Sequence, residues 1–161
     1  MRLLIAAIGR LRAGPERELV TRYLERAKTT GRQLGLSGFE FRECAESRAA
    51  GPATRNKEEA AALLALVPAD ARLVALDERG KAITSEAFAH HIGRWRDDGT
   101  TSLIFAIGGP DGLDPAVRER ADLIVGFSAL TWPHQLVRVM LTEQLYRATT
   151  ILSGHPYHRG G

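Results

Sequence analysis

The carboxyl-terminal tail gathers side chains that can move protons and hold polar substrates. Two imidazoles, a phenol and a guanidinium follow one another closely at His155, Tyr157, His158 and Arg159, and Pro156 stiffens the backbone between them. Imidazole is the side chain best suited to proton transfer near neutral pH. The pattern therefore predicts His158 or His155 as a base or proton relay, with Tyr157 and Arg159 positioning the substrate. Two simpler interpretations stay open, that the tail only completes a binding surface or that it is a solvated terminus.

Three loops that follow expected strands outline a cleft. The first contains Gly80, the second Gly108, Gly109 and Gly112, and the third runs over residues 127–132. In a parallel sheet, ligands bind beyond the carboxyl ends of the strands, and glycines let the backbone approach them closely. We expect a mostly apolar cleft that suits a flat heterocycle such as adenine and has no cationic clamp for a polyphosphate. The alternative is that the glycines only form tight turns.

Spacing excludes several other chemistries. The loop over residues 108–112 lacks the G-x-G-x-x-G spacing of a dinucleotide site, and Leu113 stands where a Walker A loop would have lysine. Ser128 lacks the second glycine of a nucleophile elbow. His155 and His158 have a spacing compatible with a metal, but no thiolate or nearby carboxylate completes a site, so no metal is expected.

Composition is that of one globular domain over residues 1–161, with 44% hydrophobic and 25% charged residues. A single cysteine, Cys44, suits a reducing compartment. The apolar run over residues 3–8 is too short for a signal peptide, and no stretch approaches the length of a membrane span. These features predict a cytoplasmic protein that does not enter membranes.

Charge is distributed unevenly along the chain. Residues 1–69 hold 12 Lys and Arg against 8 Asp and Glu, although the whole chain carries only +3. A basic amino-terminal half is compatible with a nucleic-acid partner. The first candidates for phosphate contacts are Arg10, Arg12, Arg17 and Arg22.

Apolar runs alternate with helical patterns, which predicts a three-layer α/β fold around a mostly parallel sheet of five to six strands. Strands are expected at Arg2–Ile8, Gly38–Cys44, Arg72–Asp77, Ser102–Ile107 and Leu123–Phe127. Helices are expected at Pro15–Leu34, Lys57–Val67, Ser85–Asp97 and Pro115–Arg120, with a last helix over residues 133–153. The segment over residues 51–56 is expected to be a mobile loop.

The last helix carries more apolar residues than one stripe can hold: Leu136, Val137, Val139, Met140, Leu141, Leu145, Ile151 and Leu152. A helix that is apolar on more than one face must pack against something besides its own sheet. We expect a second copy of the chain, and therefore a homodimer, rather than complete burial within one chain.

Several of these segments together resemble one enzyme family. The similar residues are Leu76-Asp77, Gly80-Lys81, Ile107–Gly109, Gly112-Leu113, Ser128–His134, Arg138, Glu143-Gln144, Tyr146–Ala148 and His155–Arg159. In them, and in length and element order, the chain resembles the RlmH-type methyltransferases, small enzymes of the SPOUT class. It departs from their pattern at Arg10, where lysine is frequent, in the loop near Gly51 and in two glycines after Arg159.

The resemblance implies S-adenosylmethionine as cofactor and methyl transfer to N3 of a pseudouridine in helix 69 of large-subunit ribosomal RNA. It also implies a homodimer, a trefoil knot in the carboxyl-terminal half, and a partner subunit that contributes residues such as Arg138 or Arg147 beside the tail. The implied cofactor contacts are Leu76, Gly108 or Gly109, Phe127, Ser128, Ala129, Leu130, Thr131 and Trp132.

Two other functions remain alternatives to this one. A ribosome- or RNA-binding module that kept the fold but lost catalysis would have a degraded cleft or tail, and both are intact in this sequence. Flavodoxin-like nucleotide binding would need a phosphate-cradling Ser/Thr loop after the first strand, where the chain instead has Gly9-Arg10-Leu11-Arg12. Calorimetry with S-adenosylmethionine separates the three possibilities.

Overall fold

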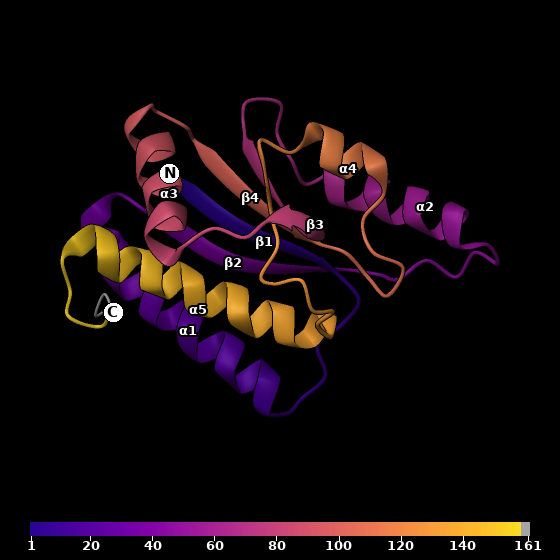
Figure 1. The fold of residues 1–161 in the computed structure, drawn as a ribbon, viewed down its shortest axis with the longest axis horizontal. Coiled ribbons are helices and arrows are strands. Elements are labelled where there is room, and N and C mark those ends of the chain that lie inside the picture. Colours follow the sequence, from indigo (N-terminus) through magenta and orange to yellow (C-terminus); the bar gives the residue numbers. More distant parts are fainter. Residues whose placement is uncertain (159–161) are drawn as a thin grey trace.

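A single parallel sheet forms the centre of the protein, whose computed structural model describes residues 1–158 (Figure 1). The strand order is β2-β1-β4-β3-β5, and every neighbouring pair is parallel. The strands are β1 (Arg2–Ile8), β2 (Ser37–Cys44), β3 (Arg72–Lys81), β4 (Ser102–Ile107) and β5 (Leu123–Val125). The central strands are almost continuously apolar because helices cover both faces of the sheet.

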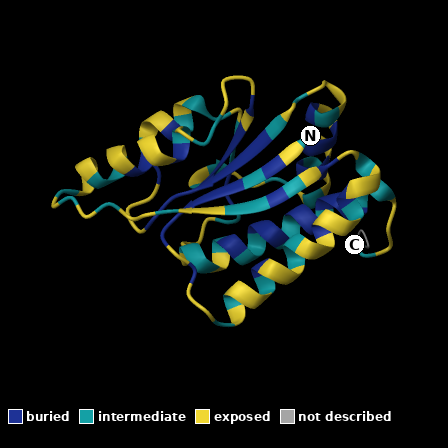
Figure 2. Cartoon of the chain, turned by 180° about the vertical axis from the view of Figure 1, so that it is seen from behind, coloured by how far each residue is buried: buried dark blue, intermediate teal, exposed yellow. Residues whose placement is uncertain are grey.

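Helices cover the sheet as two layers, which confirms the expected three-layer α/β fold (Figure 1). The helices α1 (Pro15–Gly31), α3 (Ser85–Asp97) and α5 (His134–Ser153) share one core cluster, and α2 (Pro52–Leu64) and α4 (Pro115–Arg120) share the other. A short 3-10 helix, η1 (Arg32–Leu34), follows α1. Figure 2 shows buried strands between helices that expose their outer faces. Within the described chain, no helix combines the length and apolarity needed to cross a membrane.

The expectation of a mobile loop over residues 51–56 is wrong, because α2 begins at Pro52. Proline lacks an N–H and has a fixed φ, so it fits the first turn of a helix, and Gly51 serves as the N-cap. The side chain of Arg55 also ties this turn to the glycine loop by an ion pair with Asp111 at 2.7 Å. The sequence pattern therefore marked the start of a helix.

Gly80, near the carboxyl end of β3, packs against Gly126, which directly follows β5. A Cβ on Gly80 would lie 2.5 Å from the carbonyl carbon of Val125, and one on Gly126 would lie 2.9 Å from the carbonyl oxygen of Gly80. The Gly126 N–H donates to the carbonyl of Lys81 at 3.1 Å, and β3 extends to Lys81 because that residue pairs with Val125. This close contact fixes where the next loop begins, at Phe127, which lines the cavity described below. The implied trefoil knot stays a prediction.

A fully buried guanidinium fixes the first half of α5 to the end of β1. Arg138 is 0% exposed, and its Nη2 donates to the carbonyls of Ile8 and Gly9 at 2.5 and 3.0 Å. Its Nη1 lies 3.6 Å from Glu43, and its Cζ lies 5.7 Å from the Phe41 ring centre. Its Nε and Nη1 have no hydrogen-bond partner among the described residues, and the implied contribution of Arg138 beside a partner's tail stays a prediction.

The close contact of Gly80 with the backbone at Gly126 predicts that a serine is tolerated less well at position 80 than at position 51. Gly80→Ser should lower the free energy of unfolding by about 2 kcal/mol, because the added Cβ meets backbone atoms that cannot move aside. Gly51→Ser is the control, since its Cβ would meet nothing nearer than Thr54 Oγ1 at 3.9 Å, and it should change stability by less than about 0.5 kcal/mol. Urea unfolding measures both, and equal stabilities would contradict the described contact.

Candidate active site

A cavity of about 410 Å³, here called the cleft, lies where β3, β4 and β5 end. Its size is in the range of small-molecule sites. All but one of the implied cofactor contacts line it: Leu76, Gly108, Gly109, Phe127, Ser128, Leu130, Thr131 and Trp132. Ala129 is not among the lining residues. The fold thus brings together three loops that are far apart in the sequence.

The two lining glycines of the second loop, Gly108 and Gly109, also pack closely against protein atoms. A Cβ on Gly108 would lie 2.7 Å from the carbonyl oxygen of Gly112, and one on Gly109 would lie 3.0 Å from Ile8 and 3.2 Å from Glu59. Both positions face protein atoms. A side chain on Gly108 would therefore collide with the backbone of the same turn, whereas one on Gly109 would press on the side chains of Ile8 and Glu59. The expected cofactor contacts of both glycines stay predictions.

The third loop is organised by the hydroxyl group of Ser128. Its Oγ accepts hydrogen bonds from the backbone N–H of Leu130 at 3.0 Å and from Nε1 of Trp132 at 2.8 Å. Leu130 is 68% exposed and Trp132 40% exposed, which is unusual for apolar side chains of this size. The loop therefore presents apolar surface both to the cleft and to the outside.

The rim of the cleft carries charges of both signs. Asp77 and Glu78 line it together with Arg79 and Arg118, so the lining is more charged than the mostly apolar cleft that the sequence predicts. Arg118 is paired with Asp77 at 3.3 Å and also donates to the carbonyl of Leu113. The charge of Arg118 is therefore balanced by another lining residue of the cleft, whereas among the described residues that of Arg79 is not.

Two polar lining residues outside the predicted site bear on ligand binding. Asn56 reaches the cleft from α2, and its Oδ1 is buried with no hydrogen-bond donor among residues 1–158. A donor on a ligand would satisfy this oxygen. His134, the first residue of α5, also lines the cleft. The sequence pattern predicts a loop around Asn56, so it does not indicate that this residue reaches the cleft. For His134, the indication is its position directly after Pro133, at the start of the last helix.

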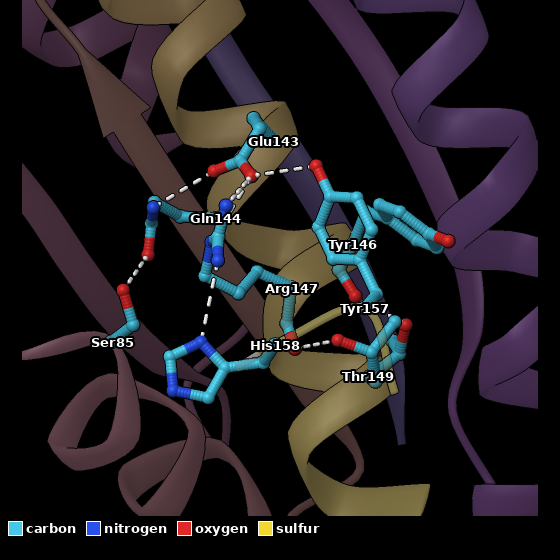
Figure 3. Close-up of polar contacts among 9 residues, drawn as sticks. Ser85, Glu143, Gln144, Tyr146, Arg147, Thr149, Tyr157 and His158 are labelled. Carbon is cyan, nitrogen blue, oxygen red and sulfur yellow. Dashed lines mark hydrogen bonds and ion pairs between the residues drawn. The ribbon is translucent and has the colours of Figure 1, made fainter. Parts of the chain in front are cut away.

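The described end of the tail is docked on α5 through one carboxylate (Figure 3). Glu143 Oε1 accepts hydrogen bonds from Arg147 Nη2 at 2.6 Å, from Arg147 Nε at 3.0 Å and from the Tyr157 hydroxyl at 3.1 Å. The ring centres of Tyr157 and Tyr146 are 4.6 Å apart. The guanidinium of Arg147 lies 5.0 Å from the centre of the Tyr157 ring. Glu143 Oε2 accepts from Gln144 at 2.8 Å. One charged oxygen therefore holds both the tail and the arginine.

Burial, and then the negative charge of Glu143, raise the pKa of Tyr157 to about 12. Arg147 opposes this shift, since its positive charge favours the phenolate. Tyr157 is therefore a neutral hydrogen-bond donor at physiological pH.

Both ring nitrogens of His158 are occupied. A guanidinium can only donate, so Nδ1 accepts from Arg147 Nη1 at 3.3 Å. In neutral His158 the proton then lies on Nε2, which is 2.5 Å from Glu86 Oε1. His155 is exposed, and its Nδ1 accepts from a backbone N–H two residues on. Arg159 lies outside the described residues. The catalytic roles expected of the tail stay predictions, and in this arrangement His158 has no free nitrogen.

A groove of about 300 Å³ runs from the cleft towards the docked tail. Phe127 and Trp132 line both the cleft and the groove, and Glu143 lies at its other end. The remaining lining residues come from α1 and α5: Leu19, Tyr23, Val139, Met140 and Gln144.

The tail and the cleft of one chain do not meet. Val137 lines the cleft, whereas Arg147, which contacts His158, lies about 15 Å further along α5 at the usual helical rise. No described tail residue lines the cleft. The described part of the tail and the cleft are thus separate sites within one chain.

Comparisons with known proteins agree with this architecture. A family model described as "Predicted SPOUT methyltransferase" matches residues 1–158. A protein named ribosomal RNA large subunit methyltransferase H from Nitrobacter hamburgensis is 62% identical over 160 residues, which cover 99% of this chain and all of that protein. The protein of the same name from Nitrobacter winogradskyi is 60% identical over the same coverage. The crystal structure of a probable methyltransferase from Bordetella pertussis Tohama I covers 91% of this chain and 95% of its own, with a TM-score of 0.53 and 14% identity. This last likeness shows a shared fold.

The docking of the tail predicts a change in the ionisation of Tyr157. Glu143→Gln removes the negative charge that opposes the phenolate, so the pKa of Tyr157 should fall from about 12 towards the ordinary value near 10. Spectrophotometric titration measures it, after subtraction of the same protein carrying Tyr157→Phe, over the pH range in which circular dichroism shows an intact fold.

Glu86→Gln is the control for this titration, because Glu86 contacts His158 and not the phenol. It should leave the Tyr157 titration unchanged. An unchanged pKa in Glu143→Gln would show that the tail is not docked on Glu143 in solution.

Proposed function

The chain belongs to the SPOUT methyltransferases, in the family of ribosomal RNA large subunit methyltransferase H, and on that premise we propose that it methylates large-subunit ribosomal RNA with S-adenosylmethionine as methyl donor. We further propose that the target is N3 of a pseudouridine in helix 69. Because the substrate is ribosomal, we place the protein in the cytoplasm. The observation that carries this proposal is the cleft formed by three strand-end loops.

The residues of the cleft suit S-adenosylmethionine. Leu76, Phe127 and Trp132 offer apolar surface for adenine, and the buried Oδ1 of Asn56 offers an acceptor for a ligand N–H. The rim offers acidic and basic groups to the amino and carboxylate ends of the methionine part. When bound, the cofactor supplies a methyl group on a positively charged sulfur. Transfer from a sulfonium needs in-line positioning and a place for the proton, so we assign no metal to the reaction.

Exposed arginines beside the end of β1 are the proposed contacts to RNA phosphates. Arg10, Arg12 and Arg22 are exposed, whereas the exposed Arg17 also donates to the carbonyl of Leu11 at 3.2 Å. Phosphate contacts of this kind would make RNA binding weaken with increasing salt.

We propose that the enzyme is a two-fold homodimer built on the outer face of α5. Leu136 is 39% exposed and shares this face with the half-buried Val139 and Met140, at helical spacing. The exposed Leu130 and Trp132 lie next to it in the chain. Large apolar patches are rare on isolated soluble chains, and a closed dimer would bury these side chains on both copies at once.

Antiparallel pairing of two α5 helices would complete the active site. An axis near Met140 places Val137 of one chain beside the partner's Glu143, and Pro133 beside the partner's Arg147. The docked tail of the partner, with Tyr157 and His158, then lies at the mouth of the cleft. We therefore propose that His155, Tyr157, His158 and Arg159 act on the substrate bound by the other chain.

Transfer of labelled methyl groups tests the proposed function. The wild-type protein should methylate N3 of the helix 69 pseudouridine in ribosomes, isolated large subunits or free RNA, compared in parallel. A variant lacking residues 155–161 should bind S-adenosylmethionine in calorimetry within about twofold of the wild type but show no transfer. Absence of cofactor binding to the wild type, or full transfer by the truncated variant, would contradict the proposal.

A further inference from the structure

One histidine stands on the wall of the cleft itself. Among the lining residues, His134 is the one imidazole, and it stands between Trp132 and Val137 at the start of α5. The tail histidines, in contrast, do not line the cleft of their own chain. His134 is thus the imidazole that is already beside the proposed cofactor before any dimer forms.

The His134 ring is free to accept a proton. It is half-buried, and neither ring nitrogen has a hydrogen-bond partner within the described chain. Burial, and then the positive charge of Arg138 one turn further along α5, lower the pKa of His134, while Glu46 from the segment after β2 opposes them. The ring is therefore neutral at physiological pH, which is the state a base requires.

The other titratable groups of the cleft are less suited to this task. Asp111 is paired with Arg55, whose hydrogen bond lowers the pKa of the carboxyl group. Asp77 is paired with Arg118, and Glu78 is an exposed rim residue. Arg79 and Arg118 carry no lone pair for a proton. Asp77 and Asp111 are held by arginines and Glu78 lies exposed at the rim, so the half-buried imidazole, without a partner among residues 1–158, is the best proton acceptor on this wall.

We propose that His134 is the base that accepts the N3 proton of the target uracil-type ring during methyl transfer. This assignment rests on the proposed function. The new bond joins N3 to the methyl carbon while the bond from that carbon to sulfur breaks, and its electron pair stays on sulfur. The proton of N3 moves to a ring nitrogen of His134. One positive charge thus disappears from sulfur and one appears on the imidazolium, which later releases its proton to water.

Titration of the His134 ring by nuclear magnetic resonance tests this placement without any activity. S-adenosylmethionine carries a positive sulfur, whereas S-adenosylhomocysteine is neutral there. If the His134 ring lies beside the reacting sulfur, its pKa should be lower with the first ligand than with the second, by about half a unit or more. The exposed His90 on α3 is the control and should titrate equally in both complexes.

Equal His134 pKa values in the two complexes would overturn the inference while leaving the proposed function intact. If S-adenosylmethionine does not bind at all, the proposed function itself fails. The two failures are therefore distinguishable.

Single-turnover kinetics at saturating cofactor and RNA give the second readout. His134→Gln should slow methyl transfer by about 100-fold or more. The wild-type rate should rise with pH and level off above the pKa of His134, whereas the rate of His134→Gln should keep rising into the alkaline range as N3 itself ionises. His90→Gln should behave as the wild type. A levelling profile that survives in His134→Gln but is lost in His158→Gln would overturn the inference in favour of the tail.

Discussion

A buried arginine holds the carboxyl-terminal half of this protein in place. Removing a guanidinium from water is costly unless carbonyls or carboxylates replace the lost hydration. Arg138 finds two carbonyls where β1 ends, Glu43 nearby and the face of Phe41. Any shift of α5 relative to β1 would break these contacts inside the core. The helix therefore has one position on the sheet. That position determines where the wall of the cleft, the groove and the docking site of the tail lie.

That fixed helix separates the two halves of the proposed chemistry. Its first turn lines the cleft, and its later turns hold the tail through Glu143 and Arg147. A rigid helix cannot bring its own ends together. An antiparallel copy of the same helix reverses the order, so that the end with the tail meets the end with the cleft. The apolar residues midway along the exposed face supply the surface on which such a pairing would rest.

The fold was predictable from the sequence because apolar runs and capping residues are local signals. The bounds of β1, β4, α3 and α4 agree with those expected. The segment after Gly51 was misjudged because the same Gly-Pro pair serves a turn or a helix start. The cleft loops were found because ligands bind where parallel strands end. The close packing of Gly109 against Ile8 and Glu59, and the burial of Arg138, depend on contacts between distant segments. No local pattern encodes these contacts, and the separation of tail and cleft likewise required the length and placement of α5.

Mixed dimers test the central claim, that each active site combines the cleft of one chain with the tail of the other. One chain lacks residues 155–161, and the other carries Thr131→Trp, which fills the cleft from an exposed position on its wall. Calorimetry must show that the second chain binds no cofactor, and light scattering that both chains dimerise. Each variant alone should be inactive. Random mixing makes about half of the dimers mixed, each with one intact site, so methylation should return to about a quarter of the wild-type rate. A mixture as inactive as its two components would contradict the account.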